Sequence, residues 1–443
     1  MEKIGFVSLG CSKNLIDTEV MLGILRDRHM EITEDLPQAD IIIVNTCTFI
    51  EKAKQESIDT ILQAARYKTE GKCKILIVTG CLSQQYKEDL MKEMPEIDAL
   101  LGTGSWDRIW EAIDTVKKGR KACFMDDVSH LYNQNTSRLR TTPKYSAYVK
   151  IGEGCNNGCS FCIIPHVRGK LYSRPVDSVV AEVQQLAADG VKEVNLIAQD
   201  TTSYGVDLAG HSLLPELLRQ LVKIDGIRWI RLHYAYPTAF PDEVIEVMAR
   251  EPKICKYLDI PFQHISDDQL AAMHRRHTKA QAYELIDKLR QAIPDLALRT
   301  TLLVGYPGET EADFEELLEF VRTVRFERLG VFPYSEEEGT YSARNLPDDV
   351  PEEVKQSRVE RVMALQNEIS LENNRARIGQ LERVIIDSRQ GDFYVGRSQY
   401  DSPEVDQEIL IPAAGRRLIR GCFYQVRITA AEDYDLYGEL ETK

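Results

Sequence analysis

The chain has 443 residues, 43% of them hydrophobic, and a formal net charge of −15. This length exceeds what one ordinary hydrophobic core can organise, so two to four domains are expected. The negative charge argues against broad, charge-driven binding to RNA, DNA or anionic membranes, although it allows a local basic groove.

The first 120 residues predict a doubly wound, parallel α/β domain. Apolar strands are each followed by a stretch of helical character, and this repetition is typical of a parallel sheet covered on both faces. The strands are expected at 3–11, 39–47 and 73–81.

A central domain is predicted over residues 141–372, after a polar linker at 121–140. Strands and amphipathic helices alternate here again, and six such units predict a partial (β/α)6 barrel of parallel strands. The strands are expected at 145–151, 193–199, 229–234, 257–262, 298–305 and 328–334.

The last segment, 373–443, changes character. Short β-like runs separated by Gly, Pro and Asp predict a small antiparallel β-barrel. From residue 377 onward we count nine Lys and Arg against twelve Asp and Glu, so this barrel is net negative. An RNA-binding barrel normally needs a positive groove, whereas an acidic one suits a basic protein. The acidity is equally typical of a solvated surface.

Nothing in the sequence predicts export or membrane insertion. No run is apolar and long enough to span a bilayer, and the start MEKIGFVSLG lacks a signal-peptide pattern. We therefore expect a cytoplasmic protein whose ten cysteines are thiols or metal ligands rather than disulfides.

Cys11, Cys47 and Cys81 each end one of the first three strands, about one strand–helix unit apart. In parallel α/β sheets, ligands bind outside the carboxyl ends of the strands, so these thiols are expected to converge on one small volume. The alternative is that each is a small buried hydrophobic residue. Cys73 begins the strand that Cys81 ends and is therefore too far away to join them.

A second cysteine trio follows the first strand of the central domain, in EGCNNGCSFCIIPHVRGK. Cys155, Cys159 and Cys162 lie where barrel enzymes place their chemistry, and a short Gly-rich loop can wrap one corner of an iron–sulfur cluster. Three ligands leave one iron open for a substrate. The alternative is structural zinc with a distant fourth ligand such as His166.

The C-x3-C-x2-C pattern, with Phe161 before its last cysteine, resembles the radical S-adenosylmethionine (SAM) enzymes. GCSKN, NTCTFI and VTGCLSQ around the first three cysteines, together with LLVGYPGET, resemble the methylthiotransferases within that superfamily. The resemblance covers nearly the whole chain and implies that the C-terminal barrel is a TRAM domain.

This resemblance implies two 4Fe-4S clusters, one per cysteine trio, with SAM as the fourth ligand of the central cluster. It also implies that a 5′-deoxyadenosyl radical removes a hydrogen from an unactivated carbon, and that sulfur and methyl are joined at the N-terminal cluster. Phe161 and Gly305 are expected near the adenine of SAM. Gln199 and Asp200 end the second barrel strand, where they could bind the cosubstrate or cap the next segment.

The family divides by substrate. GFVSLGCSKN, AQDTTSYG, FQHISDDQLAAMHRRHT and SPEVDQE resemble the group that modifies an aspartate of small-subunit ribosomal protein twelve. We therefore expect that protein as substrate, possibly within the ribosomal subunit, with a flavodoxin- or ferredoxin-like electron donor and a sulfur donor as further partners and no membrane partner. We expect the acidic residues of DSPEVDQE to attract it. The alternatives are a transfer-RNA adenosine methylthiotransferase and a non-catalytic iron–sulfur ribosome-assembly factor.

Overall fold

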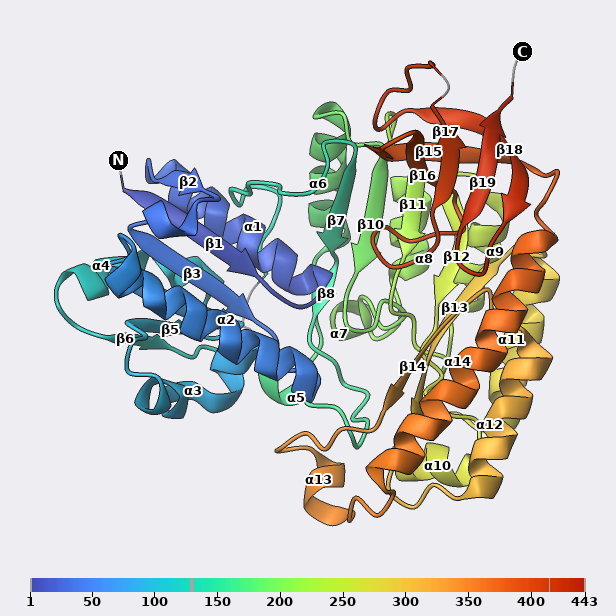
Figure 1. Ribbon diagram of the computed structural model, residues 1–443, viewed down its shortest axis with the longest axis horizontal. Helices are drawn as coiled ribbons and strands as arrows, with labels where there is room; N and C mark the ends of the chain where they lie inside the picture. Colours follow the sequence, from blue (N-terminus) through green and yellow to red (C-terminus); the bar gives the residue numbers. More distant parts are fainter. Residues whose placement is uncertain (1, 128–130, 414, 442–443) are drawn as a thin grey trace.

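The computed structural model describes residues 2–127, 131–413 and 415–441. Its first unit is a six-stranded parallel sheet in the order β2-β1-β3-β4-β5-β6 (Figure 1). Its strands are β1 (Lys3–Ser8), β2 (Glu31–Thr33), β3 (Ile41–Thr46), β4 (Ile75–Gly80), β5 (Ala99–Leu101) and β6 (Ala122–Phe124). The sequence predicted β1, β3 and β4, but not the three-residue strands β2, β5 and β6. Strand β6 extends this sheet into the segment expected as a linker.

Helices cover both faces of the N-terminal sheet, as a doubly wound fold requires. They are α1 (Ser12–Asp27), α2 (Glu51–Glu70), α3 (Cys81–Glu93) and α4 (Ile109–Lys117). Every residue of β3 and β4 is buried. These strands are continuous apolar runs because both of their faces are covered. Two hydrophobic cores result, one between the sheet and α1 with α4, and one between the sheet and α2 with α3.

The central unit is an open, six-stranded parallel sheet in the order β14-β13-β12-β11-β10-β7, which confirms the predicted partial barrel. Its strands are β7 (Ser146–Lys150), β10 (Glu193–Ile197), β11 (Trp229–Leu232), β12 (Ile254–Asp259), β13 (Ala297–Val304) and β14 (Arg328–Pro333). A short pair, β8 (Gly152–Glu153) and β9 (Tyr172–Ser173), flanks the cysteine loop.

Helices pack along the outer side of these strands around the largest hydrophobic core. The longer ones are α6 (Val176–Ala188), α8 (Leu214–Leu221), α9 (Asp242–Arg250), α11 (Lys279–Ala292), α12 (Glu311–Val324) and α14 (Glu352–Arg375). The short ones are α5 (Ile164–Val167), α7 (Val206–Ala209), α10 (Asp267–Ala272) and α13 (Tyr341–Asn345). Helix α14 then leads to the C-terminal unit.

The C-terminal unit is a closed barrel in the order β15-β16-β17-β19-β18. Its strands are β15 (Leu381–Gln390), β16 (Phe393–Arg397), β17 (Ile409–Pro412), β18 (Phe423–Ala431) and β19 (Leu436–Leu440). The small barrel was predicted, but β19 was missed, and β17 pairs with β19 in parallel rather than antiparallel.

The C-terminal barrel docks on the amino ends of the central strands, at the upper right of Figure 1. Glu193, the first residue of β10, is buried and ion-paired with Arg397 at 2.9 Å and with Arg231 at 3.2 Å. Arg231 also donates to the carbonyl oxygen of Gln399 at 2.7 Å. Burial raises the pKa of Glu193, but the two guanidinium groups outweigh it and lower the pKa to about 2. One carboxylate therefore joins two domains.

Replacing Glu193 with Gln is expected to lower the free energy of unfolding by about 3–5 kcal/mol, because it leaves the buried Arg231 without a carboxylate and Arg397 with Asp387 alone. Since the folded-state pKa is depressed, the contribution is complete above the ordinary Glu pKa and disappears as the pH falls toward about 2. Urea unfolding of the full chain at several pH values measures this. The exposed Glu284→Gln is the control, and equal stability of the two variants at neutral pH contradicts the prediction.

Candidate metal centres

The three N-terminal cysteines lie together at the carboxyl ends of adjacent strands. Cys11 follows β1, Cys47 follows β3, and Cys81 opens α3 directly after β4. These strands are neighbours in the sheet, so their ends meet at one edge. Gly10 has a φ of +83°, and a Cβ added to it would lie 2.8 Å from the Cβ of Cys47. Glycine is therefore required before Cys11 for the two loops to approach this closely.

Asn14, which was not predicted from the sequence, connects these loops by hydrogen bonds. Its Nδ2 donates to the carbonyl oxygens of Leu9 and Thr46, each at 2.9 Å. Its Oδ1 accepts a hydrogen bond from Arg168 and lies 3.9 Å from the Sγ of Cys81. One buried amide thus holds the ends of β1 and β3 beside the third cysteine. The sequence feature that could have identified Asn14 is its place in the GCSKN motif.

Arg168 reaches the N-terminal trio from the central domain. Its guanidinium is buried and pairs with Asp17 of α1 at 3.0 Å and with Glu153 at 2.9 Å. Glu153 lies two residues before Cys155, so Arg168 connects the surroundings of both cysteine trios. Sequence reasoning gave no reason to connect this residue to the N-terminal cysteines.

Charge and burial act differently on the N-terminal thiols. Cys47 and Cys81 are buried, whereas Cys11 is exposed. Burial raises the pKa of Cys47 and raises that of Cys81 to about 11. Desolvation also acts to raise the pKa of Cys11, but the positive charges of Lys13 and Arg168 outweigh it and lower that pKa. Cys11 is therefore the thiol of this trio that ionises most readily.

The second trio occupies the loop that follows β7 and β8. The backbone N–H of Asn157 donates to the Sγ of Cys155 at 3.5 Å, and Arg275 donates to the Sγ of Cys159 at 3.4 Å. Burial raises the pKa of Cys155 to about 11 and that of Cys162 to about 12. Because a metal binds thiolates, loading this site releases protons.

Neither trio is arranged for a single metal ion. Within the described parts of the chain, no group of three or more His, Cys, Asp or Glu side chains could hold one. A four-iron cluster fits this arrangement, since each cysteine then binds a different iron and the sulfurs need not converge on one point. His166 is exposed in α5, so the alternative of zinc with His166 as fourth ligand has no support.

Gln199 and Asp200 lie beside the second trio and differ in how their polar atoms are used. The Nε2 of Gln199 donates to Glu153, whereas its Oε1 is buried and has no hydrogen-bond partner among the described residues. Asp200 accepts from the backbone N–H of Thr202 at 3.0 Å and from the Nδ2 of Asn157 at 2.8 Å. Asp200 thus caps the following turn and anchors the cysteine loop, while Gln199 retains a free acceptor for a ligand's N–H.

Phe161 and Gly305 lie on the same side of the central sheet. Phe161 packs edge-to-face on Tyr306, with 6.3 Å between the ring centroids. Gly305 has a φ of +70°, and a Cβ added to it would lie 2.3 Å from the side chain of Lys355. Its backbone N–H donates to Glu309. The turn at Gly305 is therefore closely packed and holds Tyr306 against Phe161.

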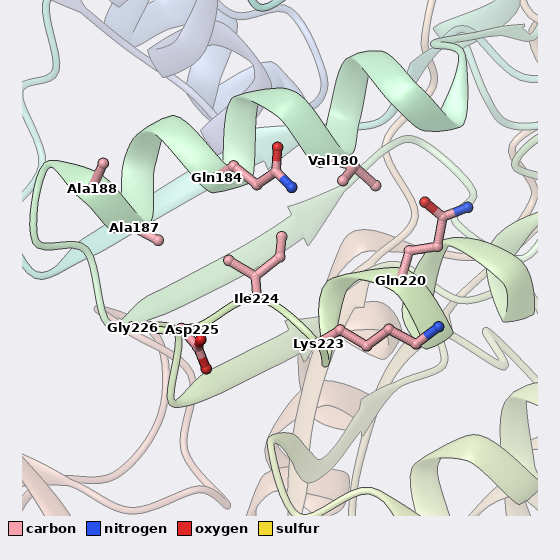
Figure 2. Close-up of a pocket in the computed structure, with 9 residues that line it drawn as sticks. All are labelled: Val180, Gln184, Ala187, Ala188, Gln220, Lys223, Ile224, Asp225 and Gly226. Atoms are coloured by element: carbon pink, nitrogen blue, oxygen red, sulfur yellow. The ribbon is translucent and has the colours of Figure 1, made fainter.

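A surface cavity of about 840 Å³ lies elsewhere, between α6, α8 and the turn before β11 (Figure 2). Its lining includes Gln184 and Ala188 of α6, Lys223, and Gly226, which precedes β11. These residues lie toward the amino ends of the strands, opposite the cysteine loop. The cavity contains none of the predicted site residues and takes no part in the candidate site.

Family models match three parts of the chain. Residues 3–102 match the uncharacterized protein family UPF0004, residues 149–321 match the radical SAM superfamily, and residues 378–440 match the TRAM domain.

Solved structures with a similar fold are radical SAM enzymes. One is the radical SAM methyltransferase TsrM from Kitasatospora setae, with cobalamin and a 4Fe-4S cluster bound. Its TM-score is 0.56 at 15% identity, covering 75% of each chain. Another is the cobalamin-dependent radical SAM enzyme OxsB, with a TM-score of 0.52 at 13% identity, covering 82% of this chain and 56% of that one. At such identities the likeness shows the fold alone.

Curated relatives match along the full length. The protein named ribosomal protein uS12 methylthiotransferase RimO from Desulforamulus reducens is 50% identical over 99% of this chain and 100% of its own. The protein of the same name from Geobacter sulfurreducens is 50% identical over 99% of this chain and 98% of its own. The chain therefore belongs to the radical SAM methylthiotransferase family.

Proposed function

We propose that this chain replaces a C–H bond with C–S–CH3 at the β-carbon of an aspartate in the small-subunit ribosomal protein uS12. The observation that carries the proposal is the full-length match, at 50% identity, to relatives named for this activity. The two cysteine trios, in domains joined through Arg168, support it, because the reaction needs one centre for the radical and another for the sulfur. The same match favours a ribosomal protein over transfer RNA as substrate.

Each cysteine trio is assigned to one 4Fe-4S cluster, Cys11, Cys47 and Cys81 to the first and Cys155, Cys159 and Cys162 to the second. SAM is assigned to the open position of the second. When bound, this cluster and SAM supply a radical that removes a hydrogen from an unactivated carbon, which a side-chain base of near-neutral pKa cannot do.

The side chains around the second trio are assigned to binding SAM. The unpartnered Oε1 of Gln199 suits the ammonium group of an amino acid, since a buried acceptor without a donor is unfavourable. Phe161 and the turn at Gly305 are assigned to the adenine, on which an aromatic ring can stack. Asp200 positions the cysteine loop rather than the ligand.

The remaining partners follow from the chemistry. The reaction consumes electrons and sulfur, so a flavodoxin- or ferredoxin-like electron donor and a sulfur donor are assigned as partners. Within the part of the chain that the structure describes, no helix has the length and apolarity needed to cross a membrane. We assign the activity to the cytoplasm, where ribosomal proteins are used.

The acidic segment DSPEVDQE contributes less free charge than its sequence indicates. Asp401 is buried and paired with Arg328, and Asp406 pairs with Arg299 at 3.3 Å. The expectation that all four acids attract the substrate is therefore wrong for these two. Glu404 and Glu408 are exposed and remain available to a basic protein.

Replacing Cys155, Cys159 and Cys162 together with Ala is expected to halve the iron of the anaerobically reconstituted protein and to abolish SAM cleavage. The same change at the N-terminal trio should also halve the iron but leave some uncoupled SAM cleavage, because the second site is intact. Iron analysis and 5′-deoxyadenosine formation measure this.

The buried cysteines outside both trios, Cys73 and Cys255, are the controls, and their replacement with Ser should leave the iron unchanged. Tightly bound zinc without iron–sulfur absorbance contradicts the assignment of the clusters.

The substrate is tested by offering the purified holoenzyme uS12 protein and, separately, bulk transfer RNA. We expect a methylthio mass gain on an aspartyl peptide of uS12, located by mass spectrometry. A gain on an adenosine nucleoside, with none on the protein, would replace the proposed substrate with transfer RNA.

Reversing Glu404 and Glu408 to Lys is expected to slow association with uS12, with a larger effect at low salt, because long-range attraction between charges is screened by ions. The association rate constant is measured at two salt concentrations, by stopped-flow mixing or by binding to immobilised uS12. Reversal of the exposed Glu284 and Asp287 on α11 changes the net charge equally and should have little effect. Equal slowing by both pairs would show that only net charge matters.

A further inference from the structure

Lys13, in the GCSKN motif two residues after Cys11, is buried with only 6% of its surface exposed. Its Nζ lies 3.0 Å from the centroid of the Tyr234 ring. Tyr234 follows the carboxyl end of β11 and has a φ of +60°, an uncommon conformation for a bulky residue. The ammonium group of the N-terminal domain therefore points at the end of the central barrel where the strands deliver their functional side chains.

Lys13 differs from most of the other buried cations in having no carboxylate partner. The remaining buried lysines and arginines each pair with a carboxylate, apart from Arg275, which donates to Cys159 and to the carbonyl oxygen of Pro261. Among the described residues, Lys13 has no ion pair with a carboxylate and no side-chain hydrogen bond. It contacts the tyrosine ring, and its charge lowers the pKa of the neighbouring Cys11 thiol. A buried ammonium group without a counter-charge is costly, so the site favours an incoming anion.

The nearby carboxylates of the described chain do not pair with Lys13. Burial raises the pKa of Asp259, although the charges of Arg299 and Lys13 act to lower it. This carboxylate lies 3.6 Å from Arg299, and its Oδ1 has no hydrogen-bond partner among the described residues. Arg299 also pairs with Asp406 at 3.3 Å. Neither carboxylate comes within ion-pair distance of Lys13. A carboxylate that pairs with Lys13 would therefore come from outside the described residues.

We propose that Lys13 binds the side-chain carboxylate of the substrate aspartate and thereby positions its β-carbon beside the Cys11, Cys47 and Cys81 site. The assignment rests on the proposed function and adds the group that recognises the substrate. The β-carbon is bonded directly to the carboxylate carbon, so fixing the carboxylate restricts the position of the reacting carbon. Asparagine, which is neutral, leaves the ammonium group uncompensated, so Lys13 also gives selectivity for aspartate.

The competing role for Lys13 is as a counter-charge for a cluster held by Cys11. That role predicts loss of iron when the charge is removed, but no dependence on the substrate's own carboxylate. The proposed role predicts the reverse, so measurements of substrate binding and of iron content separate the two.

The test uses reconstituted holoenzyme and two forms of uS12, one with the aspartate that gains the methylthio group in the wild-type assay and one with that residue changed to Asn. Kd is measured for both forms with the wild type, Lys13→Met and Lys13→Gln. The wild type is expected to prefer the Asp form by roughly tenfold to a hundredfold, the range for a hydrogen bond to a charged group. Both neutral variants should lose this preference while keeping their iron and their affinity for the Asn form.

Lys170→Met, at an exposed lysine just beyond the second cysteine loop, is the matched control and should keep the preference. A preference retained in Lys13→Met or Lys13→Gln overturns the proposal. If both variants lose the iron of the N-terminal trio, Lys13 is a counter-charge and the proposal is again overturned. If the wild-type enzyme modifies no aspartate of uS12, the proposed function is wrong, and the role proposed for Lys13 is wrong with it.

Discussion

A buried group of four charges fixes the position of the two cysteine-bearing domains relative to each other. Lys150, Glu153 and Arg168 come from the central domain, and Asp17 comes from α1. Lys150 lies 2.7 Å from Glu153, and Arg168 lies 3.0 Å from Asp17. Two positive and two negative charges balance here, and the balance needs both domains, because the central domain alone supplies two positive charges and one negative charge. The position of one cysteine trio relative to the other therefore depends on this contact.

A second ionic contact fastens the segment between the domains. Arg138 pairs with Glu19 of α1 at 2.6 Å and with Glu182 of α6 at 2.9 Å, and it donates to the carbonyl oxygen of Tyr148. This guanidinium is bound on both sides of the domain boundary, so its part of the connecting segment is structural rather than a free tether. Together with Arg168, it makes the approach of the two cysteine sites a property of the packed fold.

The parts of this fold that sequence could predict are those decided by neighbours along the chain. The apolar runs of β3 and β4 and the cysteines at their ends are local patterns, so the sheet and both cysteine trios were predictable. Strands of three residues, such as β5 and β6, carry too little pattern to be recognised. The pairing of Arg168 with Asp17 joins residues 151 positions apart, and nothing near either residue indicates it. The burial of Asp401 against Arg328 was missed for the same reason.

The region around Tyr234 brings together all three domains. Lys13 of the N-terminal domain lies on the Tyr234 ring, and His233, the preceding residue, lies 3.5 Å from the Oγ of Ser402 in the C-terminal barrel. Burial, and next to it the negative charge of the exposed Glu404, raise the pKa of Tyr148 of β7, so this loop of the C-terminal barrel lies near the same strands. On the proposed role of Lys13, a substrate loop bound there would lie close to this loop of the C-terminal barrel. Apart from Lys13, the buried charges between these domains are paired, so the ion pairs hold one arrangement of the three domains around the Tyr234 region.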